Sequence, residues 1–415
     1  MRVILFTGKG GVGKTTTAAA TAVHAARTGT KTLVMSTDAA HSLGDALGVD
    51  LTPPRGGEQP VREVEPGLYA LQVSASSSAR TSWQEVRSYV HTLLGSLGID
   101  PVVGEELTSL PGADEVVALL ELRAQVESGP WDLVVVDCAP TAETLRLLAL
   151  PEALAWHLER LMPAQRGLLR GLRPAAAAAT GLPLPGLVVL EALRRWHASL
   201  REVQQLLRAD STSVRLVLTP ERVVLAEARR TLTSLGLHGF TVDQVVVNRV
   251  FPDAATGARR PEGQAPGVPD PWRSAWNRAQ QQGLVEVQES FASLPVVHAP
   301  FLDHEPIGAD DLDELHAAST GDVDTDPLTP RPGEGMTVTR SGRRFVLRLP
   351  LPLVSAADVD LGRRGDELVV TVGEHRRLLS LPAALRRCVV TGASVRDGRL
   401  RVTFVPDERV WPRDG

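Results

Sequence analysis

The stretch from Gly8 to Thr15 constrains the fold of this chain more than any other feature. It reads GKGGVGKT and fits the pattern G-x-x-x-x-G-K-[ST], in which a glycine-rich loop surrounds phosphate oxygens. The apolar segment Arg2 to Thr7 before it has the composition of a buried strand, and the Ala-rich segment Lys14 to Arg27 after it is typical of a helix. Strand, glycine loop and helix in this order predict an α/β P-loop NTPase fold, with a mostly parallel β-sheet flanked by helices.

Each part of this loop has a chemical role to play. Glycines allow positive φ angles and bring backbone N–H groups close to phosphate, and the following helix adds a partial positive charge at its N-terminus. Lys14 is expected to reach the β and γ phosphates, and the Thr15 hydroxyl to bind Mg²⁺. The expected ligand is therefore ATP or GTP, and the alternative is a glycine-rich turn that binds nothing. The predicted nucleotide-binding residues of the loop are Gly8, Gly10, Gly11, Val12, Gly13, Lys14, Thr15 and Thr16.

Lys9 is the unusual residue of the loop, because lysine is nearly absent from the rest of the chain. Lys31 is the only other lysine besides Lys14, although Lys and Arg together number 44. With Lys9, the loop resembles the K-G-G-x-G-K-T loop of the deviant phosphate-loop ATPases, which include partitioning ATPases and arsenical-pump ATPases. In those families this lysine contacts the partner's nucleotide, so the resemblance implies a homodimer and a catalytic Lys9. The alternative is a solvated loop lysine.

The segment from Ser36 to Leu47 narrows this resemblance. It follows an expected strand, Thr32 to Met35, and reads STDAAHSLGDAL. It resembles the first switch, S-T-D-P-A-H-S-L-S-D-A-[FL], of the arsenical-pump and tail-anchored-protein targeting ATPases. The resemblance implies that Asp38 supports the magnesium shell through water and that Asp45 positions or deprotonates the attacking water. A helix cap for Asp38 and an exposed helix charge for Asp45 are the alternatives.

A third matching segment follows an apolar strand, Trp131 to Asp137. Its continuation CAPTAETLR resembles the family's second switch, D-T-A-P-T-G-H-T-L-R, which implies that Asp137 holds a magnesium-bound water. The chain departs from this pattern at Cys138, Ala142 and Glu143. Because an alanine at 142 removes the backbone freedom of glycine, we expect a greater effect on the hydrolysis rate than on binding.

Three further positions concern the nucleotide base. Asn248 ends a late strand where the family keeps an asparagine for the adenine edge, and an amide that both donates and accepts favours ATP over GTP. Pro300 and Phe301 follow another strand, where the family's backbone borders the base; simple packing is the alternative. The chain lacks the N/T-K-x-D guanine motif of GTPases.

The stretch PGADE before Val116 also resembles the family.

Composition excludes several classes of function. A net charge of −5 argues against bulk nucleic-acid binding, and no apolar run reaches the roughly 20 residues of a membrane span. The apolar stretch at the amino terminus runs into the loop and is no secretion signal, so we expect a cytoplasmic protein. The two cysteines, Cys138 and Cys388, lie 250 positions apart, which excludes a local zinc site and opposes thiolate binding of arsenite.

The remaining chain divides into a helical region, a linker and a β domain. Within an ATPase domain of residues 1–320, residues of about 83–126 and 151–209 are expected to be helical. The apolar stripe within Leu187 to Arg208 corresponds to the client groove of targeting relatives, or is ordinary core. Residues 321–336 read as a linker rich in Pro, Gly and Asp.

Residues 337–407 are expected to form an all-β sandwich, since short apolar segments alternate there with turns. The apolar segments expected to be strands are Val338 to Leu353, Val359 to Leu361, Glu367 to Val372, Arg376 to Leu381 and Arg399 to Val405. Glu367 to Gly373, Leu381-Pro382, and Ala393 followed by Asp397 to Leu400 resemble the α-crystallin domain of small heat-shock proteins. The resemblance implies a docking or client-holding module, and a generic sandwich is the alternative.

Three functions follow from these resemblances. The first is a homodimeric, Mg²⁺-dependent ATPase whose cycle opens and closes a surface for a hydrophobic client, such as a tail-anchored membrane protein. The second is the catalytic subunit of an arsenite or other oxyanion efflux pump. The third is a partition-type positioning ATPase, for which neither a basic DNA surface nor an amphipathic carboxyl-terminal helix is visible.

Overall fold

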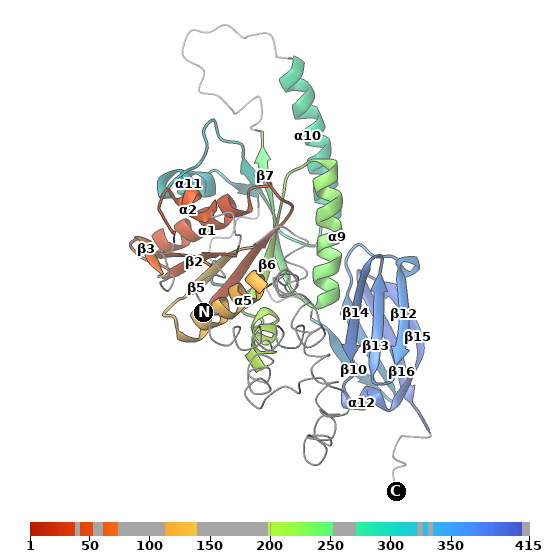
Figure 1. Cartoon of the computed structure of the whole chain (residues 1–415). Coiled ribbons are helices and arrows are strands. Elements are labelled where there is room, and N and C mark those ends of the chain that lie inside the picture. Colours follow the sequence, from red (N-terminus) through yellow and green to blue (C-terminus); the bar gives the residue numbers. More distant parts are fainter. Residues whose placement is uncertain are drawn as a thin grey trace, which may run out of the picture.

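The computed structural model describes residues 1–37, 42–52, 61–73, 113–138, 198–199, 201–251, 271–321, 327–330 and 335–408. Within these ranges, one large sheet with helices on both faces is accompanied by a separate pair of antiparallel sheets near the carboxyl end (Figure 1). The expected fold class, a mostly parallel sheet flanked by helices plus an all-β carboxyl-terminal region, is confirmed.

The large sheet has nine strands in the order β3-β4-β2-β5-β1-β6-β7-β8-β9. Neighbouring strands run parallel except at the two edges, where β3 and β9 are antiparallel to their neighbours. The central strands β1 and β5 are buried at every residue, which explains why they read as continuous apolar runs. The strands are β1 (Arg2–Thr7), β2 (Thr32–Ser36), β3 (Arg62–Glu65), β4 (Leu68–Gln72), β5 (Leu133–Asp137), β6 (Thr212–Leu218), β7 (Val242–Val250), β8 (Val296–Pro300) and β9 (Thr320–Gly321).

Helices cover both faces of this sheet. On one face α1 and α11 pack against Ile4, Phe6 and Val135, whereas α5, α9 and α10 pack on the opposite face. The helices are α1 (Lys14–Arg27), α2 (Ser42–Leu47), α5 (Ala113–Ser128), α9 (Arg222–His238), α10 (Pro271–Ser290) and α11 (Ala309–Ala317). None of the helices in the described part of the chain is both long and apolar enough to cross a membrane.

The carboxyl-terminal region is a sandwich of two sheets, β10-β11-β16-β15 and β12-β13-β14. Alternate residues of β11 and β16, including Leu347, Val402 and Phe404, point into a core shared with Leu368 and Val370. The elements are β10 (Thr337–Ser341), β11 (Arg344–Pro350), η1 (Ala356–Asp358), β12 (Val359–Arg364), β13 (Glu367–Val372), β14 (His375–Ser380), α12 (Ala383–Arg386), β15 (Cys388–Arg396) and β16 (Arg399–Pro406).

Helix α9 lies between the large sheet and the sandwich (Figure 1). Leu237 is fully buried and belongs to the core of the sandwich. The Thr233 hydroxyl donates a hydrogen bond of 2.9 Å to the Pro352 carbonyl, and the buried Arg377 guanidinium donates to the Leu237 carbonyl. The last turn of α9 is therefore part of both regions.

Several sequence predictions fall largely outside the described residues. Of the expected helical region, only residues 113–126 within α5, 198–199 and 201–207 are described as helical. Most of the leucine stripe, the PGADE stretch up to Gly112, and the second switch beyond Cys138 lie outside the described ranges. The client groove therefore stays a prediction.

Candidate functional site

The glycine loop joins β1 to α1 and is tightly enclosed at two of its glycines. A Cβ atom at Gly8 would lie 2.1 Å from the Val217 carbonyl oxygen. Gly13 has φ +92°, a conformation that disfavours other residues, and a Cβ atom there would lie 2.1 Å from Nδ2 of Asn248. Glycine is thus required at both positions for the loop to pass its neighbours.

The first turn of α1 gathers oxygen atoms from three other parts of the chain. Thr15 Oγ1 donates to Asp137 Oδ2 at 2.8 Å and lies 3.2 Å from Ser42 Oγ. The Ser36 hydroxyl donates to the same Asp137 oxygen at 3.1 Å. Because hydroxyl and carboxylate oxygens are the ligands that Mg²⁺ prefers, the donor set at the end of the loop fits this ion.

Two members of this oxygen cluster, Ser36 and Ser42, were missed by the sequence analysis. Both lie in the segment that resembles the first switch, in which roles were predicted for Asp38 and Asp45 alone. Ser42 opens α2, and Ser36 ends β2 beside the carboxyl end of β5. The pairing of adjacent parallel strands was the available signal, since it brings Ser36 and Asp137 to the same edge.

The two loop lysines occupy different environments. Lys14 is 7% exposed, and its Nζ donates to the Lys9 carbonyl at 3.3 Å, so its side chain lies along the loop. The Lys9 side chain is 38% exposed and lies 3.9 Å from Glu227 Oε2 of α9. Lys14 therefore faces its own loop, whereas Lys9 faces outward and pairs with a carboxylate of the same chain.

Asp45 lies exposed on α2, and Asp38 lies outside the described residues. Asp45 lines an open cavity of about 490 Å³ together with Asp50, Gln72 and Ile307. The backbone of α2 is held by the start of α11, because the Gly308 N–H donates to the Ala46 carbonyl at 2.9 Å.

The three residues predicted to border the base lie at the carboxyl ends of β7 and β8. Asn248 is 6% exposed, and its Nδ2 donates to the Val12 carbonyl at 2.9 Å. Its Oδ1 accepts from the Arg249 N–H at 2.8 Å. Pro300 ends β8 opposite Val250, and Phe301 is 50% exposed. Asn248 thus contacts the phosphate loop directly, and its contact with adenine stays a prediction.

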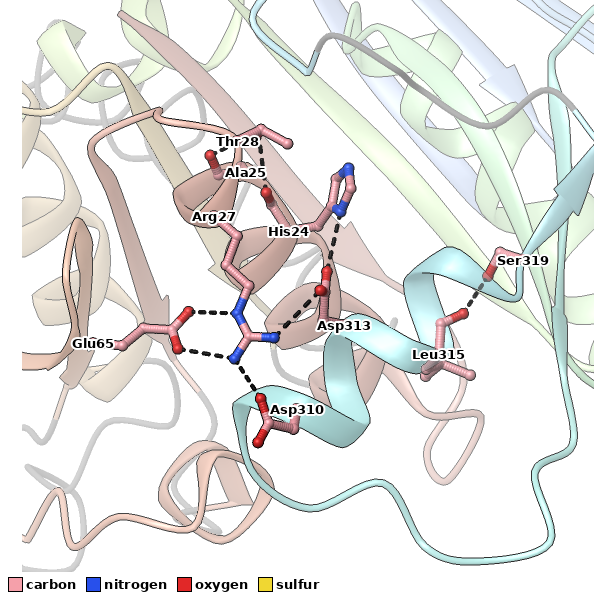
Figure 2. Close-up of polar contacts among 9 residues, drawn as sticks. All are labelled: His24, Ala25, Arg27, Thr28, Glu65, Asp310, Asp313, Leu315 and Ser319. Atoms are coloured by element: carbon pink, nitrogen blue, oxygen red, sulfur yellow. Dashed lines mark hydrogen bonds and ion pairs between the residues drawn. The ribbon is translucent and has the colours of Figure 1, made fainter.

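A cluster of charged groups anchors the opposite end of α1 (Figure 2). Arg27 contacts both Glu65 oxygens at 3.1 Å, Asp310 at 2.8 Å and Asp313 at 3.3 Å. These carboxylates, Glu65 most strongly, raise the pKa of the Arg27 guanidinium, which stays charged. This cluster ties α1 to β3 and α11, so the helix that carries the loop is held at both ends.

Two histidines extend this cluster inward. His24 Nδ1 lies 3.1 Å from Asp313 Oδ1, and its ring stacks on His316 with centroids 4.0 Å apart. Burial, with smaller contributions from His24 and Arg215, lowers the pKa of His316 to about 4. His316 is therefore neutral at physiological pH.

Comparison with known proteins agrees with this arrangement. A family model described as anion-transporting ATPase matches residues 1–319, and one described as the HSP20-like domain found in ArsA matches residues 342–404. The chain is 40% identical over 418 residues to an uncharacterized protein of Streptomyces coelicolor, covering 100% of both chains.

Two kinds of named relative were also found. The chain is 32% identical over 409 residues to a putative arsenical pump-driving ATPase of Prosthecochloris vibrioformis, covering 97% of this chain and 96% of the relative. It is 28% identical over 321 residues to the ATPase get3 of Aspergillus terreus, covering 76% and 89%. Glycine loop, oxygen cluster and both matches together identify the chain as a member of the anion-transporting ATPase family that carries a carboxyl-terminal HSP20-like domain.

Proposed function

We propose that this protein is a Mg²⁺-dependent ATPase that acts as a homodimer and couples its nucleotide cycle to a hydrophobic protein client. The observation that carries the nucleotide part is the 2.8 Å contact between Thr15 Oγ1 and Asp137 Oδ2 beside Lys14. These two oxygens are suited to hold Mg²⁺ directly or through water, with Asp38 as a further support. Bound Mg²⁺ would neutralise charge on the phosphate oxygens.

Each residue of the site then has a defined task. The loop N–H groups and Lys14 bind the phosphates, and Lys14 stabilises charge that develops on them during transfer. Asp45 orients or deprotonates the attacking water. Asn248, Pro300 and Phe301 border the adenine, which makes ATP the preferred nucleotide.

The homodimer is proposed because Lys9 has no task within its own loop. Its side chain is 38% exposed and lies 3.9 Å from the partly exposed Glu227, which is its one ion-pair partner within the described part of the chain. A cation delivered across a dimer contact stabilises the transferring phosphoryl group, and such groups raise rates by about 10³- to 10⁵-fold. Each protomer would complete the site of the other.

The client part of the proposal is supported by the relatives named ATPase get3 and by the HSP20-like domain. We assign residues 1–320 to the ATPase domain, 321–336 to a linker and 337–407 to the sandwich. Tail-anchored membrane proteins are the client class that we favour, because they present one apolar helix to a groove.

An oxyanion pump ATPase is the second candidate, favoured by relatives named putative arsenical pump-driving ATPase. The two cysteine thiols of the chain argue against this candidate. Cys138 and Cys388 are both buried and unpaired, and burial raises the pKa of each thiol. Because the thiolate is the metal-binding form, neither cysteine suits arsenite capture.

The nucleotide part is tested by Lys9→Ala, with ATP hydrolysis and sedimentation measured over a range of ATP concentrations. We expect hydrolysis to fall at least about 100-fold with ATP affinity nearly unchanged, since Lys9 acts on the partner's phosphates. Lys31→Ala is the matched control, because Lys31 lies over Tyr69 and Trp131 away from the loop. A Lys9→Ala protein that hydrolyses ATP at full rate, or a wild-type protein that does so as a monomer, would refute the homodimeric mechanism.

The client part is tested with Asp45→Asn, which should retain ATP without hydrolysing it. A synthetic single-helix tail segment should bind this variant in a nucleotide-dependent manner. Absence of binding with ATP, with ADP and without nucleotide contradicts the client assignment, and several-fold stimulation of wild-type hydrolysis by arsenite favours the pump.

A further inference from the structure

Charge is distributed unevenly between the two parts of the chain. Residues 337–407 contain thirteen arginines and seven Asp and Glu residues, so the sandwich has a net charge of +6. The whole chain has a net charge of −5, and the residues outside the sandwich therefore account for −11. Because net charge governs association rather than fold, a basic domain on an acidic chain indicates an anionic partner for that domain.

Several of these arginines share the outer face of the four-stranded sheet of the sandwich. Strands β11 and β16 alternate between buried and partly exposed residues. Leu347 and Val402 point into the sandwich core. Since successive side chains of a strand point to opposite faces, Arg348, Arg399 and Arg401 point away from the core. The outer face of this sheet is therefore basic.

The strand register brings these arginines together in pairs. Arg348 lies directly opposite Arg401, and Arg399 lies directly opposite Arg396 of β15. Directly opposed side chains have their Cβ atoms about 5 Å apart, and like charges at this distance destabilise a sheet. The sandwich thus keeps two unfavourable pairs side by side, and an anion bound between them would relieve the repulsion.

A carboxylate near this face has a separate reason for its position. Asp397 lies 3.4 Å from Arg401, with 84% of its side chain exposed. Asp397 and Gly398, with φ +53° and +66°, form the two-residue turn between β15 and β16, and Asp-Gly is a preferred sequence for such a turn. Because an exposed ion pair is weak, Asp397 leaves Arg401 able to bind another anion.

The positions beside the arginines carry hydroxyl groups. Thr337 lies opposite Arg348 on β10, and Ser394 lies opposite Arg401 on β15. The Arg348 guanidinium donates to the Thr339 hydroxyl at 2.7 Å, so this side chain lies along the sheet. Guanidinium and hydroxyl groups are both donors to phosphate oxygens, and here they form a row across all four strands.

The other side chains of this sheet favour a lipid surface over a nucleic acid. Its two aromatic residues, Phe345 and Phe404, lie opposite each other and point into the core, so the outer face has no ring on which bases stack. On the edge strand, Val389 is 41% exposed and lies opposite Val405. Basic residues beside exposed apolar ones are typical of surfaces that bind membranes.

We propose that this face, with Arg348, Arg396, Arg399 and Arg401, binds the surface of a bilayer that contains anionic phospholipids. The choice of a bilayer rests on the proposed function, because a client with a membrane anchor is released at a membrane. A basic residue near such a surface strengthens binding about fivefold. Four arginines therefore give weak, reversible binding, which suits a protein that must leave the membrane again.

The test is co-sedimentation of the full chain with phospholipid vesicles, without nucleotide and without client. We expect binding to vesicles that contain phosphatidylglycerol, no binding to vesicles of phosphatidylcholine alone, and weaker binding as the salt concentration rises. The double variant Arg348→Gln and Arg401→Gln should bind the anionic vesicles about 10- to 30-fold more weakly than wild type.

Two control variants separate this face from net charge and from misfolding. Arg348→Lys with Arg401→Lys should bind within about threefold of wild type, because a point charge suffices at a bilayer surface. Arg364→Gln with Arg376→Gln removes the same charge from two exposed positions of the other sheet and should also bind within about threefold. Urea unfolding of each variant should show a wild-type transition, since no core side chain is changed.

The possible results separate this inference from the proposed function. A wild-type protein that does not bind anionic vesicles at low salt overturns the lipid-binding face. Equal losses in the two glutamine variants also overturn it, because net charge would then account for binding, and so does tighter binding to duplex DNA than to the vesicles. A protein that binds these vesicles through Arg348 and Arg401 but hydrolyses no ATP supports the face and overturns the proposed function alone.

Discussion

Helix α9 is held differently where it faces the phosphate loop and where it faces the sandwich. In its second turn, Glu227 meets Lys9 at 3.9 Å, with the two side chains 30% and 38% exposed. In its last turn, Leu237 is fully buried in the sandwich core and its carbonyl accepts from Arg377, which is 6% exposed. Exposed ion pairs contribute about 0–1 kcal/mol to stability, whereas truncating a buried leucine costs about 2–5 kcal/mol.

This difference in stability shows that the Lys9–Glu227 contact can change while the protein stays folded. Lys9 is able to leave Glu227 for another partner at little cost, as a residue that acts across a dimer must. The sandwich is unable to leave α9 without exposing Leu237 and the Pro352 carbonyl that accepts from Thr233. Any movement of α9 relative to the large sheet therefore carries the sandwich with it.

The largest expected effect is a loss of ATP hydrolysis caused by a substitution in the phosphate loop, without a change in stability. Lys14→Ala should lower ATP hydrolysis at least about 100-fold, because it removes the cation that we propose to stabilise the transferring phosphoryl group. The unfolding transition of the sandwich should stay at its wild-type denaturant concentration. Steady-state hydrolysis and urea unfolding measure the two effects, and Lys14→Ala that retains wild-type hydrolysis contradicts the role of this loop.

The next largest effect is a loss of stability caused by a substitution in the sandwich core, without a change in ATP hydrolysis. Leu237→Ala should lower the free energy of unfolding by about 2–5 kcal/mol, because it leaves a cavity in the sandwich core. Hydrolysis by the folded fraction should remain within twofold of wild type. Val223→Ala is the matched control, since Val223 lies on the same helix with 67% of its surface exposed.

If Leu237→Ala and Val223→Ala unfold at the same urea concentration, the last turn of α9 is not part of the sandwich core. Equal losses of hydrolysis in the two variants would instead place the effect in the helix as a whole.

A smaller effect depends on pH and belongs to the same end of α9. Burial, followed by the charges of Arg377, Arg208 and His375, lowers the pKa of His238 to about 4. The unfolded chain then binds more protons than the folded one between about pH 6.5 and 4, so stability is complete above pH 6.5 and falls with pH across this window. The contribution of His238 is about 1–3 kcal/mol.

His238→Asn should flatten this pH dependence, as measured by urea unfolding at pH 7 and pH 4.5. His316, whose pKa is also lowered to about 4, titrates in the same window on the other face of the sheet. The slope should therefore decrease without vanishing. An unchanged slope would show that His238 is equally protonated in the folded and unfolded chains.

The smallest expected effect comes from a substitution in the Lys9–Glu227 ion pair. Glu227→Gln should change nucleotide-dependent dimerisation or hydrolysis by no more than about 5-fold, since an exposed ion pair at this distance is weak. The change should vanish in the Lys9→Ala background. A loss of tenfold or more that does not depend on Lys9 would show that Glu227 takes a direct part in the reaction. The contact at this end of α9 would then not be the weaker of the two.

The sequence was most informative where local chemistry decides the structure. The strand before the loop and the helix after it have the expected bounds, Arg2–Thr7 and Lys14–Arg27, and β13 has the bounds read from its apolar residues. Glycine spacing and continuous apolar runs depend on neighbours in the chain, which the sequence displays directly.

The sequence was least informative where an element depends on distant partners. Strand β15 was missed because most of its residues are partly or fully exposed and a bulge near Gly392 breaks any alternation. The expected segment Val338 to Leu353 is two strands separated by a turn at Gly342, which has φ +59°.

Two contacts close to the phosphate loop were missed for the same reason. Gln280 contacts Arg249 from 31 positions away, and Glu227 reaches Lys9 from a distant helix. Nothing in the residues around either one signals that contact, because it arises from the packing of α9 and α10 against the sheet.

The enclosure of Gly13 by Asn248 limits the mutational routes open to this chain. A methyl group at 13 would occupy the place of Nδ2 of Asn248, at 2.1 Å, so it fits only after the residue at 248 has been shortened. Shortening that residue first deprives the Val12 carbonyl of its donor. Neither change rescues the other, because position 13 keeps its φ of +92° and a methyl group there gives the Val12 carbonyl no new donor, so we expect the double variant to be at least as damaged as either single one.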